Sequence, residues 1–485
     1  MNQAATHATG AMVPQTPVSQ NWPARSLTYR DPRLLALIFV TLVSTVQGID
    51  PSLHGVAMPN VTTEFGLDRA ISSFIRSIGT IVLAASMLGV GITGDLIGRK
   101  KVLVMGAFGM AIATTINAFA PNALIFGAGR VLMGITTAMS FAMCLAFVPA
   151  LYTREELPKA FSIWLAIQSA AVVVAMLAGG AIFDIAGWRG TYLVTAGLSA
   201  IFGVLAVMYV PENKAQSSRK FDTLGVLLAA TGLISLVYSL GQAATRGWSS
   251  PVVLGGTALA LVVLTTFAVY ESRLKDPGFP VTLFKIPAFA AACIVGVLFN
   301  FANASLIGQA PALLKAAGMP ATSGLVISLL SGLLGVGCFF GAVISGWAQS
   351  KFKFSPRTMF VSGILVLAAG LLSQYLITVD NRIVIIAVGM LLVGFGIMWT
   401  QNPQSAVIMG SAPKEMVGAV GSVKPAVGQL GMGLGFGVSM PIATIFMTGG
   451  VFDVNSYRLG MMAEGFVFLV FAVLVYALLS ISNKN

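Results

Sequence analysis

The chain has 485 residues, of which 56% are hydrophobic and only 9% are charged, and its mean hydropathy is +0.89. No soluble domain of this size needs so few charged side chains, so the composition excludes a water-soluble protein and makes lipid the solvent for most of the chain. The net charge of +12 would suit a nucleic-acid ligand, but its distribution between apolar spans argues against that class.

The chain opens with a polar tail over residues 1–32, which lacks the apolar core and the small-residue cleavage site of a signal peptide. We expect this tail to be flexible and cytoplasmic. Fourteen apolar spans follow, each long enough to cross a hydrocarbon core of about 30 Å. An even number of crossings places both termini on one side. The spans cover residues 33–58, 72–94, 102–120, 123–149, 160–184, 190–210, 223–241, 252–271, 288–309, 322–347, 358–378, 383–403, 416–446 and 461–481.

Connectors that are rich in basic residues alternate along the chain with connectors that are poor in them. Of the 28 Lys and Arg residues, 19 fall on the face that holds the termini, six fall on the other face, and Arg76, Arg130 and Lys424 fall within spans. Because cytoplasmic loops carry the excess of Lys and Arg, both termini are predicted to be cytoplasmic. The 19 residues are Arg25, Arg30, Arg33, Arg99, Lys100, Lys101, Arg154, Lys159, Lys214, Arg219, Lys220, Arg273, Lys275, Lys285, Lys351, Lys353, Arg357, Lys414 and Lys484.

The connector between the second and third spans is the most informative stretch of the chain. Asp95 has a glycine four residues before it, Gly91, and another three residues after it, Gly98, and three cations follow from Arg99 onward. The glycines permit a tight turn and close helix approach, and Asp95 can pair with Arg99 or face a helix N-terminus. The run resembles the signature loop of the major facilitator superfamily of transporters, which implies a gate latch. The alternative is an ordinary basic loop of another polytopic protein.

Two further segments resemble the extra helix pair of the fourteen-helix drug:proton antiporters. They are Phe-Asp-Thr-Leu-Gly at 221–225 and Gly-Trp-Ser-Ser-Pro at 247–251. The run 345–353 keeps the cations of the signature loop without its carboxylate, which indicates two related halves. The expected fold is all-α and integral to the membrane, with 14 transmembrane helices in two six-helix halves plus two linker helices. Its parts are the tail (1–32), an N-terminal half (33–210), a linker with two extra helices (211–287) and a C-terminal half (288–485).

Asp50 and His54 lie in the first span, where an acid is costly and typically marks a proton or cation site beside a cavity. The two residues are four apart, so they share a helix face and can exchange a proton. The resemblance supports this interpretation, because Ile49-Asp50 and the run 56–59 match the family pattern, although Gly55 replaces its usual asparagine. The alternatives are structural: Asp50 ties the first helix to a neighbour, and His54 satisfies a carbonyl.

Arg130 lies in the fourth span, where a guanidinium keeps its charge and needs a carboxylate, a carbonyl or water. Asp50 is a candidate partner. The family has an arginine here that is associated with proton coupling, so Arg130 is expected to tune Asp50, although Met133 replaces the family's glutamine. The alternative is a structural arginine that bridges helices. Arg76 lies a turn or two into the second span and is expected to snorkel to the outer interface.

The fifth span departs from the antiporter pattern. It keeps the second glycine pair, Gly179 and Gly180, but has Ala175 and Met176 where those antiporters have Gly-Pro. The Gly-Pro pair is thought to shape helix bending and close packing in antiporters. The absence of the Gly-Pro pair does not change the expected fold, but it places the antiport mode in question.

A substrate cavity is predicted around Lys424, Gln168, Asn300 and Trp399. Lys424 precedes a proline in the thirteenth span, and irregular backbone at membrane depth is expected beside a cavity or other protein. The lysine could bind a carboxylate substrate there or snorkel to the interface. Gln168 and Asn300 could line the path, and Trp399 could stack on an aromatic substrate. Helix-to-helix hydrogen bonding is the alternative for each of these residues.

No catalytic constellation accompanies these residues. The chain has no Gly-x-x-x-x-Gly-Lys-Ser/Thr phosphate loop, its histidines are His7 and His54, and its three cysteines lie within spans. We therefore expect no enzyme activity, no cofactor, no metal site and no disulfide framework.

The residues and the resemblance together predict a proton-coupled secondary transporter of the bacterial inner membrane. Its partners would be a small-molecule substrate, protons and membrane lipid, with no nucleic acid, and it would work as a monomer. The resemblance favours efflux of amphipathic, drug-like molecules by proton antiport through alternating access. The intramembrane cations and the lost Gly-Pro pair favour an alternative, proton-coupled transport of an organic (aromatic) anion. A non-transporting membrane sensor on the same fold is the third hypothesis.

Overall fold

The computed structural model describes residues 32–152, 156–212, 222–274, 281–319, 324–410, 417–447 and 452–482. Within these ranges the chain forms thirteen α-helices and two short 3-10 helices, with no strand. Helices form here because a backbone in lipid must satisfy its own N–H and C=O groups. The α-helices are α1 (Pro32–Glu64), α2 (Arg69–Ile97), α3 (Arg99–Ala118), α4 (Ala123–Leu151), α5 (Leu157–Tyr209), α6 (Thr223–Arg246), α7 (Pro251–Arg273), α8 (Pro287–Ala316), α9 (Gly324–Ser350), α10 (Pro356–Leu372), α11 (Arg382–Gly410), α12 (Val417–Thr444) and α13 (Val454–Ser482).

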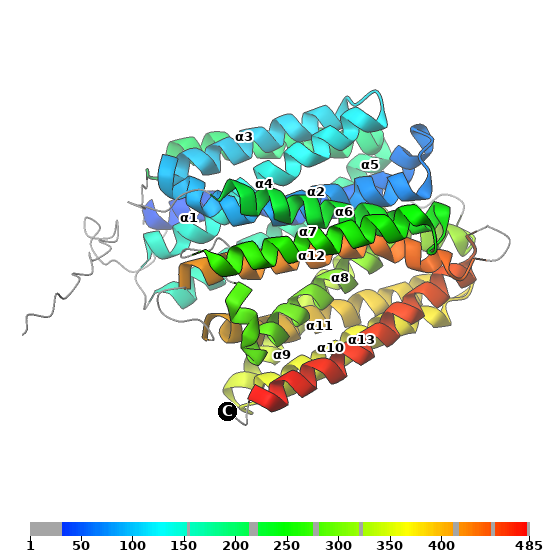
Figure 1. Ribbon diagram of the computed structural model, residues 1–485. Helices are drawn as coiled ribbons and strands as arrows, with labels where there is room; N and C mark the ends of the chain where they lie inside the picture. The colour runs from blue at the N-terminus through cyan, green and yellow to red at the C-terminus, as the bar shows by residue number, and fades with distance from the viewer. Residues whose placement is uncertain are drawn as a thin grey trace, which may run out of the picture.

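The helices lie side by side in one bundle (Figure 1). In the described part of the chain, thirteen helical segments are long and apolar enough to cross a membrane, which confirms the all-α membrane fold. Helix α1 begins and α13 ends at the same end of the bundle, on the left of Figure 1. We call this end the terminal face and the other end the opposite face. The 3-10 helices η2 (Val281–Lys285) and η3 (Ser373–Leu376) lie between helices.

Helix α5 contains two of the fourteen predicted spans, 160–184 and 190–210. At a rise of 1.5 Å per residue its 53 residues extend about 80 Å, far more than one crossing of a core of about 30 Å. Gly187 divides the element, because its φ of 65° and ψ of −170° are not helical. A positive φ suits glycine, which has no Cβ to clash. One residue thus replaces the connector that the sequence predicts between these spans.

Most helices extend beyond the predicted spans. Helix α1 continues to Glu64 rather than residue 58, and α13 begins at Val454 rather than residue 461. Hydropathy reports the lipid-facing stretch, whereas backbone hydrogen bonding continues into the polar residues beyond it. The signature loop is shorter than predicted for this reason. Helix α2 ends at Ile97 and α3 begins at Arg99, so Gly98, with φ of 109°, forms the turn alone.

The helices before α6 and those after α7 pack in the same pattern. Helix α1 packs on α5, α2 on α4 and α3 on α4, while α8 packs on α12, α9 on α11 and α10 on α11. Glycine permits the second crossing in both sets: a Cβ on Gly134 would lie 2.4 Å from the Gly79 carbonyl oxygen, and one on Gly394 would lie 2.1 Å from that of Leu334. Backbones can approach this closely only where side chains are absent.

Helices α6 and α7 pack on each other, and α6 also packs on α2 and α12. The contact between α6 and α2 includes the rings of Tyr238 and Phe74, whose centroids lie 5.1 Å apart. Helix α6 therefore covers the line where the two sets of helices meet through α2 and α12.

Some sequence predictions lie outside the described residues. They concern the tail up to residue 31, the segment 213–221 of the expected linker and several basic residues of the charge alternation. These basic residues are Arg25, Arg30, Arg154, Lys214, Arg219, Lys220, Lys275, Lys414 and Lys484.

Candidate functional site

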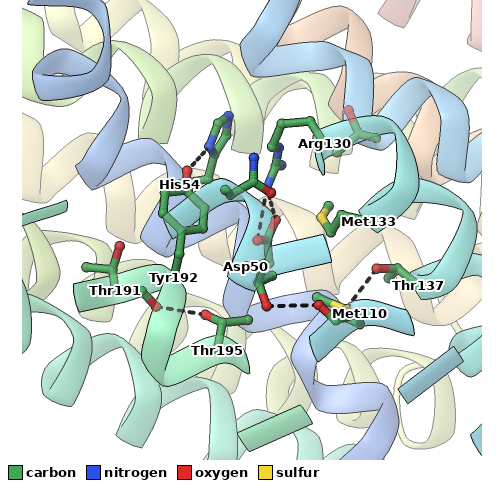
Figure 2. A network of polar contacts seen from close by, with 12 residues as sticks. Asp50, His54, Met110, Arg130, Met133, Thr137, Thr191, Tyr192 and Thr195 are labelled. Atoms are coloured by element: carbon green, nitrogen blue, oxygen red, sulfur yellow. Dashed lines mark hydrogen bonds and ion pairs between the residues drawn. The ribbon is translucent and has the colours of Figure 1, made fainter. Parts of the chain in front are cut away.

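A buried ion pair joins α1 and α4 in the middle of the bundle. Nη1 of Arg130 donates to both carboxylate oxygens of Asp50, at 2.8 and 3.0 Å. The two side chains are 1% and 2% exposed. The structure thus brings together the acid and the cation that the sequence singles out, as Figure 2 shows. A charged pair without water is stable only when each partner compensates the other, so neither group can be neutralised without affecting its partner.

The surroundings of Arg130 explain how a guanidinium fits between helices. Gly79 on α2 faces it, and a Cβ there would lie 3.1 Å from Nη2 of Arg130. Met133 is 2% exposed and packs with Val46 and Met110, so this side of α4 is apolar. Because Met133 offers no amide, Asp50 supplies the hydrogen-bond acceptors for Arg130.

His54 lies one turn along α1 from Asp50 and is also buried. Its Nδ1 lies 2.6 Å from the hydroxyl of Tyr192, which belongs to the second part of α5. The His54 ring stacks on Phe126, with ring centroids 6.3 Å apart. Figure 2 shows His54 and Tyr192 beside the Asp50–Arg130 pair. The four residues form one polar cluster, which we call the aspartate cluster.

Arg76 on α2 corrects a prediction. The sequence places it near a helix end and predicts snorkelling, but the residue is only 8% exposed. Its Nη1 donates to the backbone carbonyl of Gly308 on α8. The guanidinium therefore links the helices before α6 to those after α7. Sequence distance from a helix end gives depth along that helix, but it does not reveal a second helix that covers the position.

The signature loop is described in part. Gly98 donates its N–H to the Gly94 carbonyl, and Nη1 of Arg99 donates to the carbonyl of Ala146 on α4 at 3.3 Å. A Cβ on Gly94 would lie 2.3 Å from Sδ of Met143, so this glycine permits the contact between α2 and α4. The backbones of Gly91 and Asp95 belong to α2, and the side chain of Asp95 lies outside what the structure describes. The latch role of Asp95 stays a prediction.

The predicted substrate-cavity residues lie on four different helices: Lys424 on α12, Asn300 on α8, Trp399 on α11 and Gln168 on α5. Nζ of Lys424 on α12 donates to the hydroxyl of Ser405 on α11 at 2.6 Å. Asn300 on α8 faces α12, because a Cβ on Gly428 of α12 would lie 3.1 Å from the side-chain amide nitrogen of Asn300.

Trp399 and Gln168 have surroundings of their own. Trp399 is 9% exposed, packs with Ala348 and Met359, and donates Nε1 to Ser362 at 2.9 Å. Gln168 is half-buried on α5. The structure therefore brings Lys424 and Asn300 to α12 and shows a packing environment for Trp399.

The comparisons with known proteins decide the family. The model of the Major Facilitator Superfamily matches residues 40–436. The chain belongs to this superfamily. The match extends from the first third of α1 to α12 and includes the aspartate cluster, so these residues lie within the superfamily's own fold.

Two relatives show which kinds of protein this chain is similar to. The multidrug efflux pump LfrA of Mycolicibacterium smegmatis is 24% identical over 424 residues, which cover 85% of this chain and 81% of the relative. The tetracenomycin C resistance and export protein of Streptomyces glaucescens is 26% identical over 422 residues, which cover 86% and 76%. The chain is thus a transporter by family, and its relatives are named for export.

Solved structures agree on the fold. A POT family transporter in complex with 5-aminolevulinic acid superposes with a TM-score of 0.67 at 16% identity, covering 94% of this chain and 97% of that one. A bacterial homologue of the lysosomal transporter Spinster, in an inward-facing and unoccupied conformation, gives a TM-score of 0.66 at 15% identity, covering 94% and 98%. At these identities the likeness shows the shared architecture alone.

One buried acid of this facilitator is not singled out by the sequence analysis. Glu464 on α13 is 2% exposed and accepts a hydrogen bond from the hydroxyl of Ser305 on α8 at 2.5 Å. The rule that singles out Asp50, an acid inside an apolar span, also applies to Glu464. Tyr192 is harder to find, because only the folding of α5 back onto α1 brings it to His54.

Proposed function

We propose that this facilitator is a proton-coupled secondary transporter that exports amphipathic, drug-like small molecules in exchange for protons. The buried Asp50–Arg130 ion pair carries the proposal, and the export proteins among its relatives support the direction. The proposed parts are an N-terminal half at residues 33–210, a C-terminal half at 288–485 and a linker at 211–287. The chain lies in the bacterial inner membrane with both termini in the cytoplasm.

The ion pair couples a proton to a change in shape. While Asp50 is ionised it compensates Arg130, and the two hold α1 against α4. A proton on Asp50 removes that compensation and leaves a charged guanidinium in a site with little water, which costs several kcal/mol. The arginine then needs another partner, so protonation favours a different arrangement of the helices. Each charge moved through 100 mV supplies about 2.3 kcal/mol for this change.

The opposite face is closed by contacts between the two helix sets. Arg76 bonds the Gly308 carbonyl, and a Cβ on Gly437 of α12 would lie 3.1 Å from the Ser77 hydroxyl oxygen on α2. Opening this face requires α2 to separate from α8 and α12. With cytoplasmic termini the opposite face is the outer one, so release of an exported molecule needs the Arg76 contact to break.

One observation favours a second candidate, proton-coupled transport of an organic anion. Arg76 is buried, and among the described residues its guanidinium donates to a backbone carbonyl rather than to a carboxylate. Lys424 likewise donates to a hydroxyl. A carboxylate substrate would give either cation an anionic partner and a charge-assisted hydrogen bond.

The test uses inside-out vesicles energised by respiration, with internal pH as the readout. Ethidium, a monovalent aromatic cation, should cause proton release with the native chain and none with Asp50→Asn. Asp380→Asn makes the same chemical change at an exposed turn and should leave the signal intact. Proton movement with benzoate in place of ethidium would reject drug efflux in favour of the anion transporter. No movement with either compound would contradict both proposals.

A further inference from the structure

Glu464 lies in a second polar cluster, built by α13 and α8. The hydroxyl of Ser305 donates to its Oε2 at 2.5 Å. Nε2 of Gln309 lies 3.4 Å from its Oε1 and 3.0 Å from the Ser305 oxygen. Ser439 on α12 is buried as well, and its hydroxyl donates to the backbone carbonyl of Gly435 at 2.5 Å. All four side chains are at most 3% exposed, so bulk water does not solvate the acid.

No cation compensates this acid in the part of the chain that the structure describes. The elements packed on α13 are α8, α10, α12 and η3. Their charged and titratable side chains, with those of α13, have other surroundings. These are Cys293 (buried on α8), Lys315 (exposed), Arg357 (over the Tyr476 ring), Lys424 (bonded to Ser405), Tyr375 (under Arg458), Tyr457 (stacked on Phe452) and Arg458 (bonded to the Tyr375 carbonyl).

Such surroundings suit a carboxyl that takes up and releases a proton. A buried carboxylate without a cation is far less stable than the neutral acid, because hydroxyl and amide donors compensate only part of the lost hydration. The Ser305 hydroxyl can either donate to the ionised form or accept from the protonated one. The same cluster therefore accommodates both states without moving a helix.

The Gln309 amide supports this conclusion independently. Its Oε1 is buried and has no hydrogen-bond partner within the described residues. A protonated Glu464 is a donor, and an amide turned by 180° would present its oxygen to that donor. The amide thus offers an N–H to the carboxylate and an oxygen to the acid.

The cluster also adjoins the contact between the helix sets. Gln309 directly follows Gly308, whose carbonyl accepts the Arg76 guanidinium. Glu464 lies ten residues after Val454, so about 15 Å of helix separates it from the end of α13 at the opposite face. A change of charge at Glu464 acts on the turn of α8 that closes that face.

We propose that Glu464, with Ser305 and Gln309, is a second proton-binding site, located among the helices after α7 and separate from the Asp50–Arg130 pair. Binding of the proton itself rests on this geometry. Its use in transport rests on the proposed antiport, in which two protonatable carboxyls would allow two protons per cycle.

The test is a pH titration of the full chain in liposomes, followed by infrared difference spectroscopy of the protonated carboxyl C=O band. Glu464→Gln should remove one band that the native chain and Asp50→Asn both keep. Glu64→Gln, at an exposed glutamate, serves as the matched control and should keep that band. An unchanged set of bands in Glu464→Gln would overturn the proposal.

A second variant keeps the carboxyl and guards against a folding defect. Ser305→Ala removes a donor to the ionised form, so the titration midpoint of the same band should rise by about one pH unit. An unmoved midpoint would overturn the assignment of Ser305 to the site. Because the band needs no substrate, a proton site without ethidium antiport would contradict the proposed function alone.

Discussion

The two sets of helices share a packing pattern but hold their buried acids differently. Asp50, before α6, is ionically paired with Arg130, whereas Glu464, after α7, is held by a hydroxyl and an amide. Pairing with a cation stabilises the charged form, and neutral donors leave the neutral form accessible. The comparison teaches that a repeated scaffold fixes where helices cross without fixing the electrostatics inside it.

The positions of the two acids differ as well. Asp50 and Arg130 lie on the first and fourth helices of their set, and Ser305 and Glu464 lie on the first and last helices of theirs. Glycines, by contrast, recur at equivalent crossings of α2 with α4 and of α9 with α11. Packing therefore follows the repeat, and the polar chemistry does not.

Breaking the ion pair should have the largest effect. Asp50→Asn leaves a buried guanidinium uncompensated, so the free energy of unfolding should fall by about 3–5 kcal/mol. The double variant Asp50→Asn with Arg130→Met removes both charges and should recover most of that loss. Thermal unfolding of the purified chain in detergent measures both. Equal loss in the single and double variants would show that the pair is not held by charge compensation.

The shared packing can be tested at the helix crossings. Gly134→Ala forces a Cβ against the Gly79 carbonyl and should cost about 1–3 kcal/mol. Gly394→Ala should cost as much in the other set, because its Cβ meets the Leu334 carbonyl. Gly127→Ala, on α4 with nothing within 4 Å, is the control and should cost nothing measurable. A large loss for Gly127→Ala, or none for the other two, would contradict close backbone packing in both sets.

The smallest effect is expected at an exposed acid. Arg189, at 2.7 Å, and Trp188 hold the pKa of Glu64 below its usual 4.5. Since the unfolded chain then binds the proton more readily, this pair stabilises the fold above pH 4.5, and its contribution disappears as the pH falls through the folded-state pKa. Arg189→Gln should flatten that part of the stability profile slightly, because both groups are solvated. An identical profile would leave the pair without a role in stability.

The sequence predicts most of the fold because hydropathy reports lipid contact directly. It places a break between residues 184 and 190, but it does not predict that the connector is reduced to the single non-helical residue Gly187. Asp50 and Arg130 are found because charge within an apolar span is rare. Arg76 is placed wrongly at a solvated interface because the covering helix α8 lies more than 200 residues away in the chain.

The contact between Arg76 and Gly308 has a consequence for how such a protein evolves. The acceptor is a main-chain oxygen, which every residue type carries, so no substitution at position 308 deletes it. When two side chains form a contact, substitutions at the two positions are expected to be correlated among related sequences. For this contact only the position of Arg76 is expected to be restricted in side-chain chemistry. A bulkier residue at 308 would instead press a Cβ toward Nη1 of Arg76 and the ring of Phe436. Keeping this contact therefore requires an arginine at position 76 and a residue without a side chain at position 308.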